Sequence, residues 1–353
     1  MRKLRNVKPA HRCLGSGLIA LDIVYPTRRD AKAFLSIGGS CGNVLSILNA
    51  FGIEAIPVVQ LGYDEAGKVL IDALKRCDFD VHYVTRAKGT GTPIIVQTFI
   101  SDRHGSNKHS FSFNCPDTGA KLPRFRPVAM ETARHIARTL GKVDSYYSDR
   151  LVPSTHLLAE ASRKQDALVF LEPSARFTRN EFLSTAPIAH VLKVSHELIT
   201  RNDRILDAVW NPVQIVTAGE KGLWYRMGLR PGIFGPWHRL TADSVRHVVD
   251  PAGSGDWASV GVILSLLAHD WHKAIRNKGI VREAIRFGQS LAAENCRWIG
   301  AQGLLYSEQF AEFLNMATAK FVSAGSLGTI LPNKIPKPSY LRARPIDFTV
   351  PCS

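Results

Sequence analysis

Short apolar, β-branched segments alternate along the chain with longer segments whose apolar residues recur at helical spacing. Helices are predicted at 41–52 and 65–77. Buried-looking strands, each stopped by turn residues, are predicted at 17–25, 55–62, 166–173, 189–195 and 213–219. Repeated βα units favour a mainly parallel sheet covered by helices on both faces. The predicted fold class is α/β, with ligands expected at the carboxyl ends of the strands.

The segment 90–114 departs from this alternation. It holds two strand-like runs joined by a polar turn that contains Gly105, a pattern typical of a hairpin. Beyond about residue 317 the helical pattern stops, and the last residues carry five prolines. We therefore expect one domain at 1–317, with a small lid formed around 17–36 and 90–114, and an extended or partly disordered tail at 318–353.

Composition and charge narrow the class of protein. The chain is 45% hydrophobic and 21% charged, as globular proteins are, and its formal charge of +15 attracts anions such as nucleotides. Neither an Arg/Gly repeat nor a zinc-finger spacing supports nucleic-acid binding. No 18-residue apolar run predicts a membrane span, so we expect a soluble protein. The six cysteines are scattered without a C-x-x-C pair, which predicts reduced thiols in the cytoplasm.

The stretch "DPAGSGDWASVGVILSLL" (250–267) places two glycines before an apolar, helix-like run, after a strand-like segment at 245–249. Gly253 and Gly255 let the backbone come close to a ligand. The N–H groups at the helix start favour an anion, with the helix dipole adding to the effect. Asp256 either only caps the helix or accepts the proton of a hydroxyl that attacks a phosphate.

A second glycine-rich stretch, "SIGGSCGNVLSILNAFG" (36–52), lies near the N-terminus. Gly38 and Gly39 either bring bare backbone to a ligand or form a simple strand-to-helix turn, and Asn43 adds a donor and an acceptor. Asp22 lies inside an apolar strand, where a charge is costly unless it has partners. Sugar hydroxyls would be such partners; a backbone group is the alternative.

These stretches occur in order with "GYDEAG" and "VTAGEKG" between them. In this respect the chain resembles the ribokinase-type (PfkB) carbohydrate kinase family over about residues 13–305. The resemblance implies a ribokinase-like fold, with a central mostly parallel sheet flanked by helices and a small β-sheet lid. It also implies transfer of the γ-phosphate of ATP to a substrate hydroxyl. Mg²⁺ is the expected metal, with a monovalent cation such as K⁺ as a further candidate.

The resemblance also assigns roles to residues. Asp256 matches the general base, and the anion hole matches Gly253, Ser254 and Gly255. The residues that match substrate-binding positions are Asp22, Gly38, Gly39 and Asn43. The residues that match the nucleotide-binding loop are Thr217, Gly219 and Gly222. Asn295 lies in a region that borders the adenine in this family.

Two positions depart from the family pattern. Pro251 stands where the family commonly has Thr, which removes one backbone donor, though not one from the Gly-Ser-Gly-Asp turn. The Asn-x-x-Glu motif that helps to place Mg²⁺ is half present: aligning on Glu197 leaves Val194 at the Asn position, and aligning on Ser195 leaves Leu198 at the Glu position. Glu197 is the candidate metal residue.

The sequence thus predicts a cytoplasmic, ATP-dependent kinase that phosphorylates a hydroxyl of a sugar or sugar-like substrate. Two alternatives remain: a nucleoside kinase of the same fold, and a non-catalytic regulatory protein that binds a nucleotide or a sugar. Homodimerisation through the lid is expected, and neither a membrane nor a nucleic acid is an expected partner.

Overall fold

The computed structural model describes residues 11–25, 33–101, 107–200 and 203–322. The last described helix ends at Val322, so that most of the expected tail lies outside the described residues, as does Gly105 of the predicted hairpin turn.

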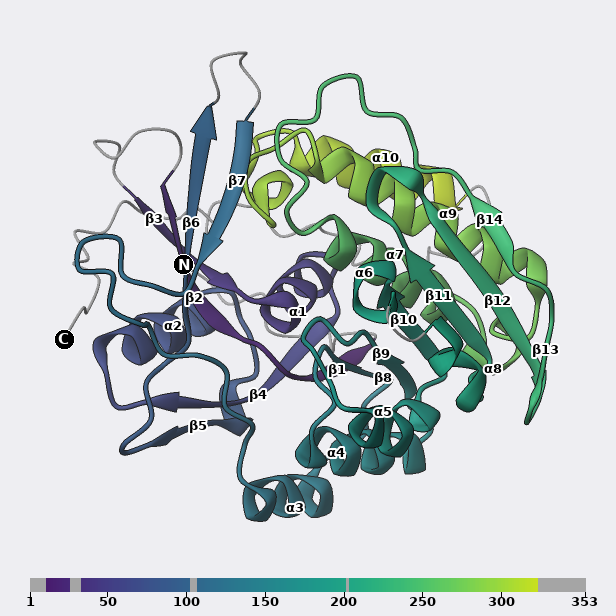
Figure 1. Ribbon diagram of the computed structural model, residues 1–353, viewed down its shortest axis with the longest axis horizontal. Helices are drawn as coiled ribbons and strands as arrows, with labels where there is room; N and C mark the ends of the chain where they lie inside the picture. Colours follow the sequence, from purple (N-terminus) through teal and green to yellow (C-terminus); the bar gives the residue numbers. More distant parts are fainter. Residues whose placement is uncertain (1–10, 26–32, 102–106, 201–202, 323–353) are drawn as a thin grey trace, which may run out of the picture.

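A ten-stranded sheet forms the centre of the described structure (Figure 1). Its strands follow the order β13 (Ile233–Phe234), β12 (Leu223–Arg230), β11 (Val213–Thr217), β10 (Val191–Ser195), β9 (Leu168–Leu171), β8 (Ser145–Ser148), β1 (Arg12–Ser16), β4 (Glu54–Gly62) and β5 (Val84–Ala87), with β14 (His238–Leu240) also paired to β12. From β11 to β5 every pairing is parallel, whereas β12 pairs antiparallel with its neighbours. The predicted mostly parallel α/β sheet is confirmed.

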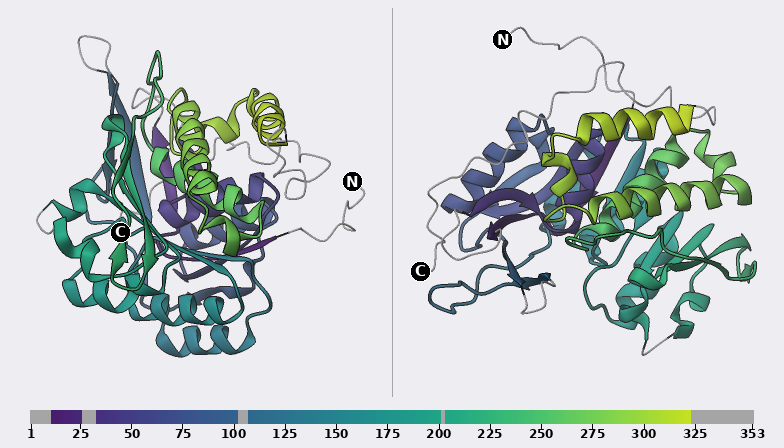
Figure 2. Two further views of the ribbon diagram at one scale, coloured as in Figure 1. Left: turned by 90° about the vertical axis from the view of Figure 1, so that its right-hand side faces the viewer. Right: turned by 90° about the horizontal axis from the view of Figure 1, so that it is seen from above.

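Helices cover both faces of this sheet (Figure 2). One layer contains α1 (Ser40–Ala50), α7 (Ser254–Leu267), α9 (Lys278–Asn295) and α10 (Phe310–Val322). The opposite layer contains α3 (Met130–Thr139), α4 (Pro153–Lys164) and α5 (Arg179–Thr185). Each layer has its own apolar core, which explains why the parallel strands are continuous hydrophobic runs.

The short helices α6 (His196–Ile199) and α8 (Trp271–Ala274) follow β10 and α7 along the chain. Helix α7 is buried on almost every side and packs against α9 through two glycines. A Cβ on Gly261 would lie 2.5 Å from Gly288 Cα, and one on Gly288 would lie 2.3 Å from Ala258 O. The close approach of these helices therefore requires the missing side chains.

A separate four-stranded sheet lies beside the main body, in the order β3 (Phe34–Gly38), β2 (Ala20–Tyr25), β6 (Ile94–Ser101) and β7 (Asn107–Ser112). It packs its apolar face on α2 (Glu65–Arg76) through Leu21, Ile23, Ile94 and Val96. We call these four strands the lid sheet. The predicted hairpin is its β6–β7 pair. The strand predicted at 17–25 begins later, at Ala20, since the residues between Ser16, which ends β1 of the central sheet, and Ala20 connect the two sheets.

Two expectations from the sequence are wrong. Residues 245–249 form no strand, and Val248 is 57% exposed, because none of the described strands pairs with this segment. Cys115 is disulfide-bonded rather than reduced. The described cysteines that are free are Cys13, Cys41, Cys77 and Cys296.

Candidate active site

Helix α7 begins in a turn that only glycine can form. Gly253 caps the helix in the left-handed conformation, with φ 72°, and a Cβ on it would lie 2.5 Å from Ala301 O. Ser254, Gly255 and Asp256 form the first turn of the helix. Ser254 N–H bonds to Pro251 O at 3.2 Å. The N–H groups of Gly255 and Asp256 also lie in this first turn, where a helix has no internal partner for them, so they are the donors that it presents to an anion.

Asp256 forms a hydrogen bond with a residue that is far from it in the sequence. Asn43, on α1, donates its Nδ2 to Asp256 Oδ2 at 2.7 Å, although the two residues are 213 positions apart. Asn43 Oδ1 in turn accepts a hydrogen bond from Gln302 Nε2 at 2.9 Å. The predicted base and a predicted substrate-binding residue are therefore brought together.

The pKa of Asp256 is raised well above that of an ordinary aspartate. Burial is the main cause, since the carboxylate is only 8% exposed, and the negative charge of Glu172 adds to it. The hydrogen bond from Asn43 and the charge of Lys193 act in the opposite direction. A carboxyl group with a raised pKa is a stronger proton acceptor once it is ionised.

A buried ion pair lies beneath the turn. Lys193, on β10 and 2% exposed, contacts the carboxylate of Glu172 at the end of β9. Its ammonium also donates to Gly255 O at 2.8 Å and to Ser259 Oγ at 3.0 Å, so that all three donors are used. Because the peptide bond is planar and trans, holding Gly255 C=O also fixes the direction of the Asp256 N–H.

This ion pair was not predicted from the sequence. The signal was present, since Lys193 interrupts the apolar run "VLKVS" and Glu172 directly follows "LVFL". A charge within a buried strand needs a partner of opposite charge, but the sequence does not say which one. The pairing was not predictable because β9, β10 and α7 meet only in the folded chain.

Asp22 lies on β2 of the lid sheet and is 2% exposed. It accepts a hydrogen bond from Gln97 on β6, and burial raises its pKa to about 8. A Cβ on Gly38 would lie 1.8 Å from the Asp22 carboxyl carbon, so this glycine makes room for the carboxylate. Gly39, with φ 77°, leads into α1, and a Cβ there would lie 2.4 Å from Leu18 O.

A small cavity joins the lid sheet to the main body. Asp22 and Gln97 of the lid sheet and Asn43 of α1 are among the residues that line it. Residues 299–303 and Tyr306 also line it. Residues 299–303 belong to the region expected to border the adenine and not to the predicted sugar site. Their connection to α1 through Gln302 was not predictable from the sequence.

Asp250 holds the start of the turn. Its carboxylate accepts from Ala252 N at 2.9 Å and from Gly300 N at 2.7 Å. Because Ala252 supplies the N–H, the exposed Pro251 deprives the turn of no hydrogen bond. Asn295 is fully buried and bonds to Ala252 O at 3.1 Å, which corrects the expectation that it approaches an adenine: it supports the turn instead.

The residues assigned to the nucleotide lie after β11. Thr217 ends that strand, and Gly219 has φ 56° with open space around its Cβ position. Gly222 has φ 86°, and a Cβ on it would lie 2.2 Å from Leu240 O. Glu197 follows the neighbouring strand β10 and is exposed. These residues follow two adjacent parallel strands and therefore share the carboxyl edge of the sheet.

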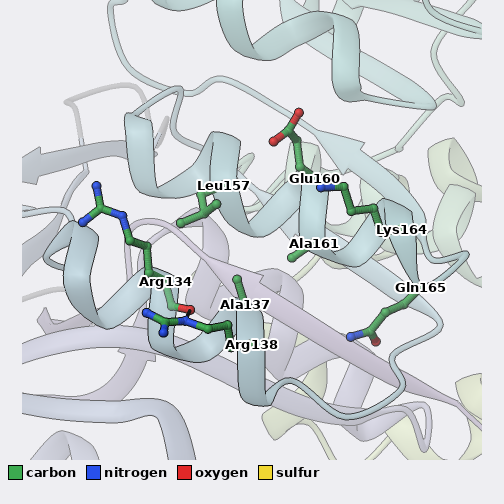
Figure 3. Close-up of a pocket in the computed structure, with 8 residues that line it drawn as sticks. All are labelled: Arg134, Ala137, Arg138, Leu157, Glu160, Ala161, Lys164 and Gln165. Carbon is green, nitrogen blue, oxygen red and sulfur yellow. Dashed lines mark hydrogen bonds between the residues drawn. The ribbon is translucent and has the colours of Figure 1, made fainter.

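Other features of the described residues lie outside this site. A hollow of about 450 Å³ between α3 and α4 is lined by Arg134, Arg138, Glu160 and Lys164, among others (Figure 3). None of the predicted site residues lines it. In the described ranges, no group of three or more His, Cys, Asp or Glu side chains could hold a metal ion, and no helix is long and apolar enough to cross a membrane.

Comparisons with known proteins agree with the geometry. The chain is 27% identical to fructokinase-1 of Oryza sativa over 289 residues, which cover 75% of this chain and 84% of the relative. It is equally similar, at 27% identity over 288 residues, to fructokinase-1 of Zea mays, again with 75% of this chain and 84% of the relative covered.

Solved structures show the same fold at lower identity. A fructokinase from Xylella fastidiosa with bound ATP superimposes with a TM-score of 0.63 and 15% identity, over 88% of this chain and 99% of that one. A nucleoside kinase from Burkholderia thailandensis in complex with inosine gives a TM-score of 0.58 and 18% identity, over 88% and 97%. These likenesses confirm the predicted ribokinase-like fold.

The model of the pfkB family carbohydrate kinases matches residues 17–307, which include both the lid sheet and the Gly-Ser-Gly-Asp turn. The chain therefore belongs to the pfkB family of carbohydrate kinases, phosphotransferases that act on an alcohol group.

Proposed function

We propose that the chain transfers the γ-phosphate of ATP to a hydroxyl of a free sugar, with Asp256 as the general base. The observation that carries this proposal is the contact between Asp256 and Asn43 at a glycine-capped helix start. A proton acceptor, an anion-binding turn and a polar cavity thereby lie within one site.

In the proposed reaction, a substrate hydroxyl lies beside Asp256. Its oxygen forms a bond to the γ-phosphorus, the bond from that phosphorus to the bridging oxygen of ADP breaks, and the hydroxyl proton passes to Asp256. The N–H groups of the turn at Gly253–Asp256 hold the charge on the transferred group. Catalysis of this kind relies on positioning and electrostatic stabilisation.

The nucleotide is proposed to bind at the loop that follows β11, against Thr217, Gly219 and Gly222. Glu172 is a poor metal ligand as it stands, because its carboxylate is bound to Lys193. The site therefore fits a Mg²⁺ ion that is held mainly by ATP phosphates and water, with Glu197 as the side chain available at that edge. Such an ion, when bound, neutralises phosphate charge; K⁺ is proposed as a further activating ion.

The Asp256→Asn variant tests the base. The amide that replaces the carboxylate keeps an acceptor for Asn43 but cannot take a proton, so we expect kcat to fall by about 10²- to 10⁴-fold with little change in the KM for the sugar. ADP release is measured with Mg-ATP and D-fructose, D-ribose and inosine, with Glu283→Gln, at an exposed position of α9, as the control. Turnover by Asp256→Asn at the wild-type rate would contradict the role of Asp256.

D-fructose is the first sugar to test, because the curated relatives are fructokinases. Exclusive turnover of inosine would favour the nucleoside kinase alternative, and absence of turnover with any acceptor would favour the non-catalytic one. We further propose a cytoplasmic location, a single kinase domain at 1–317 followed by the tail at 318–353, and homodimerisation through the lid sheet.

A further inference from the structure

Two buried oxygen atoms in the cavity beside the lid sheet have no hydrogen-bond partner among the described residues. They are Asp22 Oδ1 and Gln97 Oε1. Both side chains are 2% exposed, and both line the cavity. An acceptor that is buried without a partner is destabilising, so such atoms point to a missing donor.

The pairing of the strands places these two side chains next to each other. Strands β2 and β6 are parallel, with Asp22 opposite Ile95 and Val24 opposite Gln97. Gln97 Nε2 donates to Asp22 Oδ2, which fixes the orientation of both groups. Each group is left with one free acceptor at the same wall of the cavity.

The polar groups that Gln302 brings to the cavity are already satisfied. Gln302 Nε2 donates to Ile37 O at 2.6 Å and to Asn43 Oδ1 at 2.9 Å, which uses both of its N–H groups. Gln302 Oε1 accepts from Tyr306 at 2.9 Å. The acceptors that still need a donor are therefore Asp22 Oδ1 and Gln97 Oε1, both on the lid sheet.

We propose that Gln97 contacts the substrate: its Oε1 and Asp22 Oδ1 accept hydrogen bonds from two neighbouring hydroxyl groups of the sugar. Gln97 is thereby a specificity-determining residue, which selects acceptors with a pair of adjacent hydroxyls. The inference rests on the proposed function. It adds a residue and a substrate requirement that Asp22 alone does not give.

The expected discrimination follows from the burial of both acceptors. A sugar that lacks one of the two hydroxyls leaves a buried acceptor unpaired in the wild-type protein. A variant without that acceptor loses much less kcat/KM when the hydroxyl is absent. The effect of the Gln97 amide therefore depends on whether the sugar carries the hydroxyl that it contacts.

A cycle of variants and deoxy sugars tests the inference. Wild type and Gln97→Leu are compared for kcat/KM on D-fructose and on its monodeoxy analogues, with ADP release as the assay. We expect Gln97→Leu to lower kcat/KM for D-fructose about 10- to 100-fold, and to change it much less for one particular deoxy analogue. The KM for ATP should stay unchanged.

Thr98→Val is the matched control, because it removes a polar group from the adjacent position of β6, whose side chain faces the other side of the lid sheet. Thermal unfolding shows whether each variant is folded. An equal loss by Gln97→Leu on every sugar would indicate a purely structural role and overturn the inference. If D-fructose is not turned over, the same cycle uses D-ribose or inosine and their deoxy forms.

Binding without ATP separates this inference from the proposed function. Calorimetric titration of the sugar into wild type and Gln97→Leu should show the same hydroxyl-dependent loss of affinity, whether or not phosphate is transferred. Binding with no turnover would contradict the kinase proposal and leave the Gln97 contact standing. Neither binding nor turnover with any of these acceptors would overturn both.

Discussion

At the scale of single residues, two buried carboxyl groups differ in what surrounds them. Asp256 has Lys193 nearby, which partly offsets its burial, whereas Asp22 has only the neutral amide of Gln97 as its described hydrogen-bond partner. Asp22 is therefore expected to hold a proton over much of the neutral range, in keeping with its pKa of about 8. Hydroxyl groups of a sugar would favour its ionised form.

This difference predicts how stability depends on pH. The pKa of Asp22 rises from 3.8 to about 8 on folding, so between these values the folded state keeps a proton that the unfolded state has released. The free energy of unfolding should therefore fall as pH rises through this window, by up to about 1.4 kcal/mol per pH unit. In Asp22→Asn the slope should be smaller. Urea unfolding between pH 5 and pH 8 measures the free energy of unfolding of both proteins. If it depends on pH equally in wild type and Asp22→Asn, the prediction is contradicted.

Single residues also differ in whether their place in the site was predictable from the sequence. Asp256 and Asn43 were predictable because each follows glycines at a helix start. Gln97 was not, since a glutamine in a strand is ordinary and its value lies in its position beside Asp22. The same holds for Gln302, which reaches Asn43 from a loop 259 positions away.

At the scale of elements, the first turn of α7 depends on the strands beneath it. Lys193 on β10 and Glu172 after β9 connect the sheet to the carbonyl of Gly255. Removal of one partner leaves the other charge buried and unpaired, which typically costs about 3–5 kcal/mol. The predicted base and its anion-binding turn are thus held in place by the ion pair.

Lys193→Met should lower the free energy of unfolding by about that amount and lower kcat at temperatures where the variant is folded. The double variant Glu172→Gln/Lys193→Met should recover part of the stability, because it no longer buries a lone charge. Lys68→Met is the control, since that side chain is 66% exposed. If unfolding titrations show that the double variant loses as much stability as Glu172→Gln and Lys193→Met lose together, the prediction is contradicted.

The crossing of α7 and α9 gives a second test at this scale. Gly288→Ala would place a Cβ 2.3 Å from Ala258 O and force the helices apart, at a cost of about 1–3 kcal/mol. Gly279→Ala, on the same helix, meets only the end of the Asn277 side chain, at 3.2 Å. Thermal unfolding should separate the two variants, and a Gly288→Ala variant as stable as wild type would show that the helices can move.

At the scale of the whole molecule, the site joins parts of the chain that lie far apart in sequence. Asp22 and Asn43 come from the first fifty residues, whereas Asp256 and Gln302 come from the last described segments. The alternation of apolar segments was enough to predict a parallel sheet, because each βα unit is a local pattern. It could not predict the lid sheet's order or the loop at 299–303, which depend on contacts between distant segments.

The net charge leads to a prediction for the molecule as a whole. A formal charge of +15 should attract Mg-ATP, which is anionic, from beyond contact distance. Raising the ionic strength from about 20 to about 200 mM with tetramethylammonium chloride, at constant K⁺, shortens the Debye length and should lower kcat/KM for ATP several-fold. The kcat should change little, because the buried groups around Asp256 are screened much less. A salt-independent kcat/KM would show that the charge lies where the nucleotide does not approach. Retention on DNA that persists at about 200 mM salt would instead indicate that nucleic acid is its partner.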